Sequence, residues 1–183
     1  MDSRLARHLD RTEIKDVIYR YCRGVDRHDL ELVRACYHPD ASDHHGSFSG
    51  SLEEYLVWLE PLLARYSWTQ HLIANVVIDF GVEEDVAASE AYGVALHRSS
   101  EPKPYLNLIS GFRYLDRFER REGLWKVAER KVISEWSILP SQEAWWPLPE
   151  HLEQGTRGPG DALYALLAGL VEPAGGKRGD NGS

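Results

Sequence analysis

Four side chains combine reactive groups with positions that favour chemistry: Tyr21, Asp26, His71 and Arg130. His71 is the clearest of them, because imidazole is the usual general base at neutral pH. It opens an extended segment on a face where polar and apolar side chains alternate. Such a face is typical of the wall of a wet cavity or of a solvated surface. We expect that it lines a cavity and that His71 is the base there.

The other three side chains have structural alternatives. Asp26 continues the apolar stripe of the first helix near its C-terminal end, where the macrodipole disfavours an anion, so it can equally lie in the turn and face water. Arg130 lies on a mainly apolar strand face and needs an anionic ligand or a buried acidic partner. Tyr21 lies in the helical stripe, where a tyrosine usually packs in the core with its hydroxyl bonded to a neighbour.

The strand that carries His71 is predicted at residues 70–80, which are rich in β-branched residues and end at Gly81. Successive side chains of a strand point to opposite faces. One face carries only apolar side chains, namely Leu72, Ala74, Val76, Ile78 and Phe80. The mixed face carries His71, Ile73, Asn75, Val77 and Asp79. We expect the apolar face to point outward into a subunit interface, next to small residues at alternate positions 87–95 of the following strand.

Apolar residues at helical spacing predict three helices before this strand. They follow N-caps at Thr12, Asp29 and Ser51 and end near residues 26, 37 and 65. Residues 1–11 are expected to be frayed or only loosely helical. Residues 41–50 predict a tight hairpin or loop around Gly46. Three more strands are predicted at about residues 86–98, 105–120 and 124–139.

Helices followed by strands indicate an α+β fold with an antiparallel sheet and helices on one of its faces. A curved sheet of this kind leaves a conical cavity between the layers. We predict one domain over residues 1–140, an arm with a short helix over residues 141–172, and a disordered tail over residues 173–183. Trp145 and Trp146 in the arm either close over an aromatic substrate or pack against a neighbouring subunit.

The composition excludes several classes of protein. The chain has 183 residues with a net charge of −8, which argues against a nucleic-acid partner. It contains no apolar run long enough to span a bilayer and does not open on a basic and then apolar signal, so we expect no membrane contact and a cytoplasmic location. It also contains no G-x-G-x-x-G, P-loop or G-x-S-x-G pattern, so nucleotide and α/β-hydrolase functions have no support.

Metal chemistry is not expected either. Three histidines and two aspartates lie between His38 and His45, but their spacing matches no compact metal motif, so a solvated loop is the expectation. Cys22 and Cys36 lack metal-type spacing and are expected to be small buried hydrophobes. We therefore expect neither a metal nor a cofactor, and any mechanism must use side chains alone.

Four stretches, in order, resemble the SnoaL-like branch of the NTF2-like superfamily. They are IYRYCRGVDRHD at residues 18–29, YHPDA at 37–41, QHLIAN at 70–75, and GFRYLDRFER continuing as GLWKVAER at 111–130. Together they span about residues 12–138. The resemblance implies a cone-shaped barrel, in which three N-terminal helices pack on a curved, mainly antiparallel sheet. The branch contains polyketide cyclases, scytalone dehydratase, the lindane dehydrochlorinase and the bile-acid dehydratase.

The resemblance also implies roles for the four candidates. In dehydratase and dehydrochlorinase members, an Asp that closes the first helix orients a His on the first long strand, and an Arg lies on the last strand. By position these are Asp26, His71 and Arg130, while Tyr21 matches a Tyr of the bile-acid dehydratase. Tyr21 would donate a hydrogen bond to a leaving oxygen or oxyanion, and Arg130 would stabilise negative charge. The candidate substrate-binding residues are Asn75, Trp136, Tyr55 and Tyr105.

The function implied is that of a cofactor-independent lyase for a small apolar cyclic or aromatic molecule. Loss of water is the default, and loss of halide or formaldehyde would use the same base. The first alternative is an isomerase or cyclase of the ketosteroid isomerase or polyketide cyclase type. The second is a non-catalytic subunit, in which Asp26 and His71 would lie apart. A homotrimer packed sheet to sheet is expected, because related dehydratases associate in this way.

Overall fold

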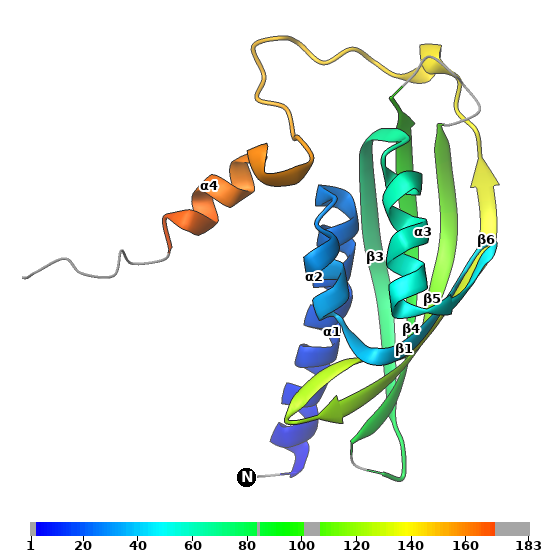
Figure 1. Ribbon diagram of the computed structural model, residues 1–183, viewed down its shortest axis with the longest axis vertical. Coiled ribbons are helices and arrows are strands. Elements are labelled where there is room, and N and C mark those ends of the chain that lie inside the picture. The colour runs from blue at the N-terminus through cyan, green and yellow to red at the C-terminus, as the bar shows by residue number, and fades with distance from the viewer. Residues whose placement is uncertain (1–2, 84, 101–106, 171–183) are drawn as a thin grey trace, which may run out of the picture.

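Three helices cover one face of a six-stranded sheet (Figure 1). The structure is a computed structural model that describes residues 3–83, 85–100 and 107–170. The helices are α1 (Ser3–Arg27), α2 (Leu30–Ala35) and α3 (Leu52–Leu63). The predicted α+β class, with the helices on one side of the sheet, is therefore confirmed.

The sheet is mixed and open. Its strands are β1 (Tyr37–His45), β2 (Phe48–Ser51), β3 (Tyr66–Phe80), β4 (Val86–Ser99), β5 (Leu108–Arg121) and β6 (Leu124–Ile138). They lie in the order β2-β1-β6-β5-β4-β3, and all neighbours are antiparallel except β1 and β6, which are parallel. Because β2 and β3 are edges that do not meet, the predicted cone is not closed into a barrel.

Helix α1 begins nine residues before the predicted cap. Thr12 lies inside the helix, where its hydroxyl donates to the carbonyl of His8 at 3.0 Å. Tertiary contacts hold the early turns: Asp10 accepts from the Trp125 indole at 3.0 Å, and Arg11 donates to the carbonyl of Ile78 at 2.7 Å. The start that was expected to be frayed or loosely helical is a regular helix from Ser3 onward, because the contacts that order this segment come from distant strands.

The other two N-caps are confirmed. Asp29 accepts from the backbone amide of Leu32 at 3.0 Å at the start of α2. Ser51 and Glu54 form a reciprocal capping box at the start of α3. Side chains thus satisfy one free backbone amide at the start of α2 and two at the start of α3, a local feature that sequence alone reveals.

Strand β1 was not predicted at its full length. Helix α2 ends at Ala35 instead of residue 37, and the chain enters a strand that pairs in parallel with β6. Gly46, with a φ of 62°, makes the turn from β1 to β2. The partner strand lies far along the sequence, so no local pattern could reveal it.

The face assignment of β3 was right for its first half and wrong for its second. The register shifts between Ile73 and Val76, where β3 carries one residue more than β4. His71 and Ile73 therefore point toward the helices, but so do Val76 and Ile78, with Ile78 in the core. The predicted outward apolar face does not exist as a continuous surface.

The small residues of β4 also have a different role from the predicted one. Ala87, Ala91 and Ala95 are buried in the core that β4 shares with the helices. Their short side chains lie on the helix-covered face of the sheet, where they leave room for the helices to pack. They do not lie on the outer face. The alternating pattern was correct, but the face was not.

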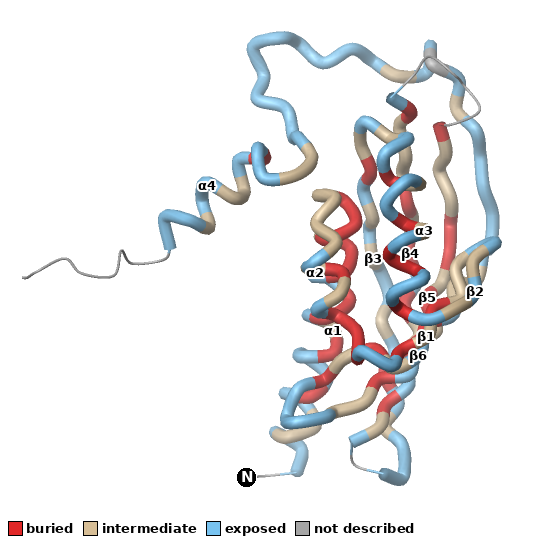
Figure 2. Tube along the Cα trace, viewed as in Figure 1, coloured by how far each residue is buried: buried red, intermediate tan, exposed pale blue. Residues whose placement is uncertain are grey.

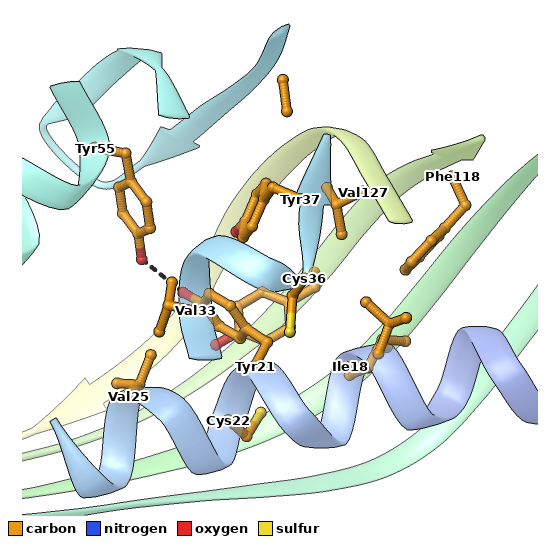
Figure 3. Packing of buried hydrophobic residues seen from close by; sticks show 14 of the residues in the cluster. Ile18, Tyr21, Cys22, Val25, Val33, Cys36, Tyr37, Tyr55, Phe118 and Val127 are labelled. Carbon is orange, nitrogen blue, oxygen red and sulfur yellow. Dashed lines mark hydrogen bonds between the residues drawn. The ribbon is translucent and has the colours of Figure 1, made fainter. Parts of the chain in front are cut away.

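The core lies between the helices and the sheet, where buried residues of α1 face those of α3 and of the strands (Figure 2). Aromatic residues dominate its centre, with Tyr21 and Tyr37 edge to face at 5.9 Å (Figure 3). Cys22 and Cys36 are buried free thiols, as predicted.

The chain beyond β6 is described up to residue 170. It contains the short 3-10 turns η2 (Gln142–Ala144) and η3 (Gly158–Gly160) and the helix α4 (Ala162–Ala168). Arg157 ties the arm down by donating to the carbonyls of Leu63, Tyr66 and Val25 at 2.7, 2.9 and 3.1 Å. The predicted tail, residues 173–183, lies wholly outside the described residues. No helix in the described part of the chain is long and apolar enough to cross a membrane.

Candidate active site

A cavity of about 230 Å³ lies between α1, α3 and the sheet. Its wall is mainly apolar and carries a small number of polar groups, which is typical of a small-molecule site. The histidines in the wall are His45, His71 and His97, and the tyrosines are Tyr21, Tyr55, Tyr66 and Tyr114.

The predicted hydrogen bond between Asp26 and His71 is present at the edge of this cavity. His71 Nδ1 lies 2.7 Å from Asp26 Oδ1, and the backbone amide of His71 donates to Oδ2 at 2.9 Å. The Thr69 hydroxyl donates to Oδ1 at 3.1 Å. Because both carboxylate oxygens are held, the imidazole ring is fixed in one orientation, and Nδ1 is occupied by Asp26.

The local fold explains why these groups meet. Asp26 lies in the last turn of α1, which packs along β3, so its carboxylate points at the strand and not at water. The side chains of His71 and Asp26 are 8% and 13% exposed. Phe112 and His97 contact the His71 ring edge-on, with centroids 6.1 and 5.7 Å away. The second nitrogen, Nε2, is thus the atom left for a bound molecule.

Tyr21 and Tyr55 bring their hydroxyls together in the cavity wall. The two oxygens lie 2.6 Å apart, and either can be the donor. Burial raises the pKa of both hydroxyls above the ordinary value. Both groups therefore carry their protons at neutral pH, so the pair has one hydrogen to give to a ligand beyond the bond that it makes internally.

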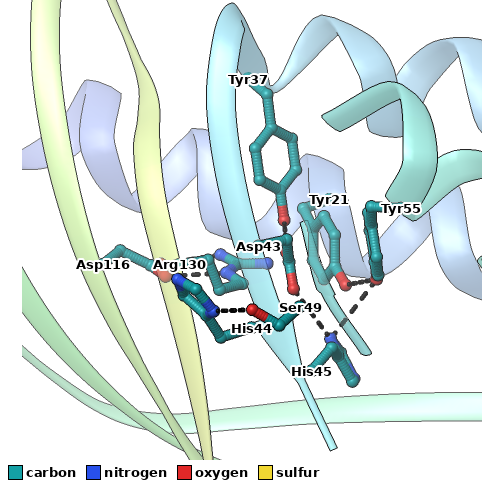
Figure 4. Close-up of polar contacts among 9 residues, drawn as sticks. All are labelled: Tyr21, Tyr37, Asp43, His44, His45, Ser49, Tyr55, Asp116 and Arg130. Carbon is teal, nitrogen blue, oxygen red and sulfur yellow. Dashed lines mark hydrogen bonds and ion pairs between the residues drawn. The ribbon is translucent and has the colours of Figure 1, made fainter. Parts of the chain in front are cut away.

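Arg130 is where the structure departs most from the catalytic prediction. It is fully buried and donates twice to Asp116, through Nε and Nη2, at 2.7 Å each (Figure 4). Its guanidinium lies over the rings of Tyr21 and Tyr114, at 4.0 and 4.1 Å from their centroids. It is not part of the cavity wall, so the buried-pair alternative describes its position.

A register shift in β6 puts Arg130 on that inner face. Arg117 pairs with Glu129 but Phe118 pairs with Val127, so β6 carries one extra residue at this point. Arg130 therefore shares a face with Val127 and not with Ala128, as strict alternation would have predicted.

The structure divides the predicted substrate-binding residues. Tyr55 lies in the cavity wall. Asn75 is exposed and lies where β3 carries its extra residue. Trp136 is half exposed and packs over Gly111. Neither side chain lines the cavity. Tyr105 lies outside the described residues.

The histidines between residues 38 and 45 do not converge. His38 Nε2 lies 2.9 Å from the carbonyl of Glu119, and His44 Nδ1 lies 2.7 Å from the Ser49 hydroxyl. Only His45 reaches the cavity. Among the described residues, no group of three or more histidine, cysteine or acidic side chains is placed to hold a metal ion.

Sequence reasoning missed three polar residues of the site. Thr69 lies two positions before His71, so the period of a strand could have placed it on the same face. His97 lies opposite Thr69 in the register of β3 and β4, which only the tertiary structure shows. His45 follows Ala41 and Asp43 on the inner face of β1, a pattern hidden because residues 41–50 were predicted only as a tight hairpin or loop, with no face assigned.

His97 differs from the other cavity histidines in its electrostatics. Burial, and then the nearby His71, lower its pKa to about 4. At neutral pH it is therefore an uncharged ring. Its Nδ1 is buried with no hydrogen-bond partner in the described part of the chain.

Comparison with protein families gave one match. A model described as a SnoaL-like domain matches residues 6–131, which is more than half of the chain. No curated protein matches it.

Solved structures share the fold at low sequence identity. A scytalone dehydratase candidate from Novosphingobium aromaticivorans is 20% identical, with a TM-score of 0.66 over 85% of this chain and 97% of that one. Hexachlorocyclohexane dehydrochlorinase LinA-type3 from Novosphingobium barchaimii is 20% identical, with a TM-score of 0.71 over 80% and 100%. A Mycobacterium tuberculosis protein of unknown function is 19% identical, with a TM-score of 0.63 over 74% and 77%.

Proposed function

Because this chain belongs to the SnoaL-like domain family, we propose that it is a cofactor-independent lyase that eliminates a small group from an apolar cyclic or aromatic molecule. The single observation that carries the proposal is the 2.7 Å contact between Asp26 and His71 at the edge of a largely apolar cavity. Two of the similar structures are described as a dehydratase candidate and a dehydrochlorinase, both of which are elimination enzymes.

In the proposed mechanism His71 Nε2 removes a proton from the carbon next to the breaking bond. The electrons of that C–H bond form the new double bond, and the leaving group departs with the electrons of its own bond. Asp26 keeps the proton on Nδ1, so that Nε2 presents its lone pair, and it stabilises the imidazolium that forms. A positioned base contributes roughly 10²–10⁴-fold to such a step.

The remaining candidates have supporting roles in this proposal. The hydroxyls of Tyr21 and Tyr55 donate a hydrogen bond to the oxygen on which charge develops. Arg130 acts as a positioning residue, because its guanidinium lies under the Tyr21 ring and does not face the cavity. The size of the cavity favours substrates of one or two rings.

The test is turnover of a panel of cyclic β-hydroxy ketones, from one ring to a steroid skeleton, followed by mass spectrometry. Loss of the mass of water supports the lyase. Conversion at unchanged mass would instead identify an isomerase or cyclase that uses the same base. If no compound in the panel turns over and ligands still bind, the chain is better described as a binding module.

We also propose that the chain forms a homotrimer through the outer face of the sheet. After the register shift in β3, the apolar side chains left outside are Leu72 and Val77, with Tyr92 on the neighbouring strand, and each is about half exposed. Light scattering at micromolar concentration tests this, and a stable monomer would contradict it.

A further inference from the structure

The cavity contains a second histidine with a carboxylate beside it. His45 lies on β1, on the opposite edge of the cavity wall from β3, and Asp43 precedes it by two positions on the same face. His45 Nδ1 lies 3.6 Å from Asp43 Oδ1 and 3.5 Å from the Tyr55 hydroxyl. Figure 4 shows this group of side chains next to the buried arginine.

Asp43 is a strong counterion because of its burial. Its side chain has no exposed surface, and Oδ2 accepts from the Tyr37 hydroxyl at 2.7 Å. Oδ1 has no hydrogen-bond partner in the described part of the chain. A buried carboxylate oxygen without a donor is costly unless a cation lies nearby. The fully buried Arg130 lies opposite Asp43 on the neighbouring strand β6, and His45 Nδ1 lies 3.6 Å from Asp43 Oδ1, within ion-pair distance.

The His45 ring is held in place while remaining accessible. It stacks on Tyr55 with ring centroids 5.6 Å apart and an interplanar angle of 21°, and it contacts Trp58 at 6.0 Å. Its side chain is 25% exposed. Because Nδ1 faces Asp43 and Tyr55, Nε2 is the nitrogen that is free to face a bound molecule.

The three cavity histidines therefore differ in what they can do. His71 is oriented as a base by Asp26, and His97 is uncharged at neutral pH because burial lowers its pKa to about 4. Of the three, only His45 pairs with a carboxylate whose side chain has no exposed surface, that of Asp43 at 3.6 Å.

We propose that His45 is the general acid of the elimination, donating the proton that turns a poor leaving group into a neutral molecule. This inference rests on the proposed lyase function. As His71 Nε2 takes the proton from carbon, the C–H electrons form the double bond and the C–O electrons pass to oxygen. That oxygen receives the proton of His45 Nε2 and leaves as water. His45 then regains a proton from solvent and His71 releases one to it, so the cycle closes.

The test uses two substrates that give the same product, β-hydroxycyclohexanone and β-chlorocyclohexanone, with the spontaneous reaction subtracted. Hydroxide needs a proton to leave and chloride does not. His45→Gln should lower turnover of the alcohol by roughly 10²–10⁴-fold and change turnover of the chloride by only a few-fold. His71→Gln should lower both, because both need the base.

A matched control is available in the neighbouring histidine. His44 lies on the other face of β1, bonded to Ser49, so His44→Gln should change neither reaction. Equal losses on both substrates in a folded His45→Gln protein would overturn the inference, and so would full activity on the alcohol. Folding of each variant is checked by near-UV circular dichroism.

The unmodified protein gives an independent measurement if the variant does not fold. Turnover across a series of leaving groups of increasing basicity should change little, because a donated proton cancels the developing charge. A steep fall with basicity would overturn the inference while leaving the lyase function intact. If the unmodified protein turned over neither substrate, the proposed function would fail first, and this inference with it.

Discussion

Two of the pairs in which a carboxylate meets a nitrogen base or cation differ in burial. Asp26 and His71 are joined at 2.7 Å at the cavity edge, with side chains 13% and 8% exposed. Asp116 and Arg130 are joined by two bonds of 2.7 Å, and neither has any exposed surface. The same contact distance therefore serves two purposes. A small opening to a cavity leaves one nitrogen free for chemistry, whereas complete enclosure leaves a charge pair that can act only through the side chains packed on it, such as the Tyr21 ring.

Tyr21 connects the two regions. Its ring lies over the Arg130 guanidinium at 4.0 Å, and its hydroxyl lies in the cavity wall 2.6 Å from the Tyr55 hydroxyl. Changes to the cavity pair should thus lower turnover and spare the fold, whereas changes to the enclosed pair should act first on the stability of the fold.

The largest effect is expected at the cavity pair. His71→Ala or Asp26→Asn should lower turnover by roughly 10²–10⁴-fold, because the first removes the base and the second removes the acceptor that fixes its tautomer. Steady-state kinetics measures the loss, and thermal unfolding should show a folded protein in both cases. Full activity of the His71 variant would mean that another group is the base.

The second effect is expected at the enclosed pair and concerns stability. Arg130→Met should lower the free energy of unfolding by about 3–5 kcal/mol, because Asp116 would then be a buried charge without a partner. Denaturant unfolding measures the change. The double variant Arg130→Met with Asp116→Leu should recover much of the loss, since no buried charge remains. If the double variant were as unstable as the single one, the loss of stability would come from removing the ion pair itself and not from leaving the Asp116 charge without a partner.

A smaller effect is expected from His97 as pH changes. Its folded-state pKa of about 4 lies below the ordinary value of 6.5, so the unfolded chain binds more protons between these values. Stability should therefore fall as pH falls from about 6.5 to 4, by up to roughly 3 kcal/mol from this group. The free energy of unfolding, measured at several pH values in this range, should depend less on pH for His97→Phe than for the unmodified protein. Identical pH dependence in both proteins would mean that other groups carry it.

The smallest effect is expected where the two regions meet. Tyr55→Phe removes one hydroxyl of the 2.6 Å pair and leaves the ring in place. The free energy of unfolding should fall by about 1 kcal/mol, which is the usual net value of one buried hydrogen bond. Tyr37→Phe is the matched comparison on the enclosed side, because it removes the bond to Asp43. A larger loss of unfolding free energy from Tyr55→Phe than from Arg130→Met would contradict this difference between the cavity wall and the enclosed pair.

The sequence by itself determined the features that depend on near neighbours. The caps at Asp29 and Ser51, the helical stripes and the four long strands follow from local side chains, and the α+β class follows from their order. Family resemblance located the partners Asp26 and His71, although 45 residues separate them.

Tertiary structure decided which face each strand presents. The extra residue of β3 between Ile73 and Val76, and that of β6 between Val127 and Glu129, reverse the alternation, so that Val76 and Arg130 point inward and Asn75 lies at the surface. A side chain's face in a strand has a period of two, and a single inserted residue therefore inverts every assignment that follows it. The insertion is visible only where the neighbouring strand fixes the register. For the same reason His45 could not be placed in the cavity from sequence, because its strand pairs with β6, more than eighty residues further along the chain.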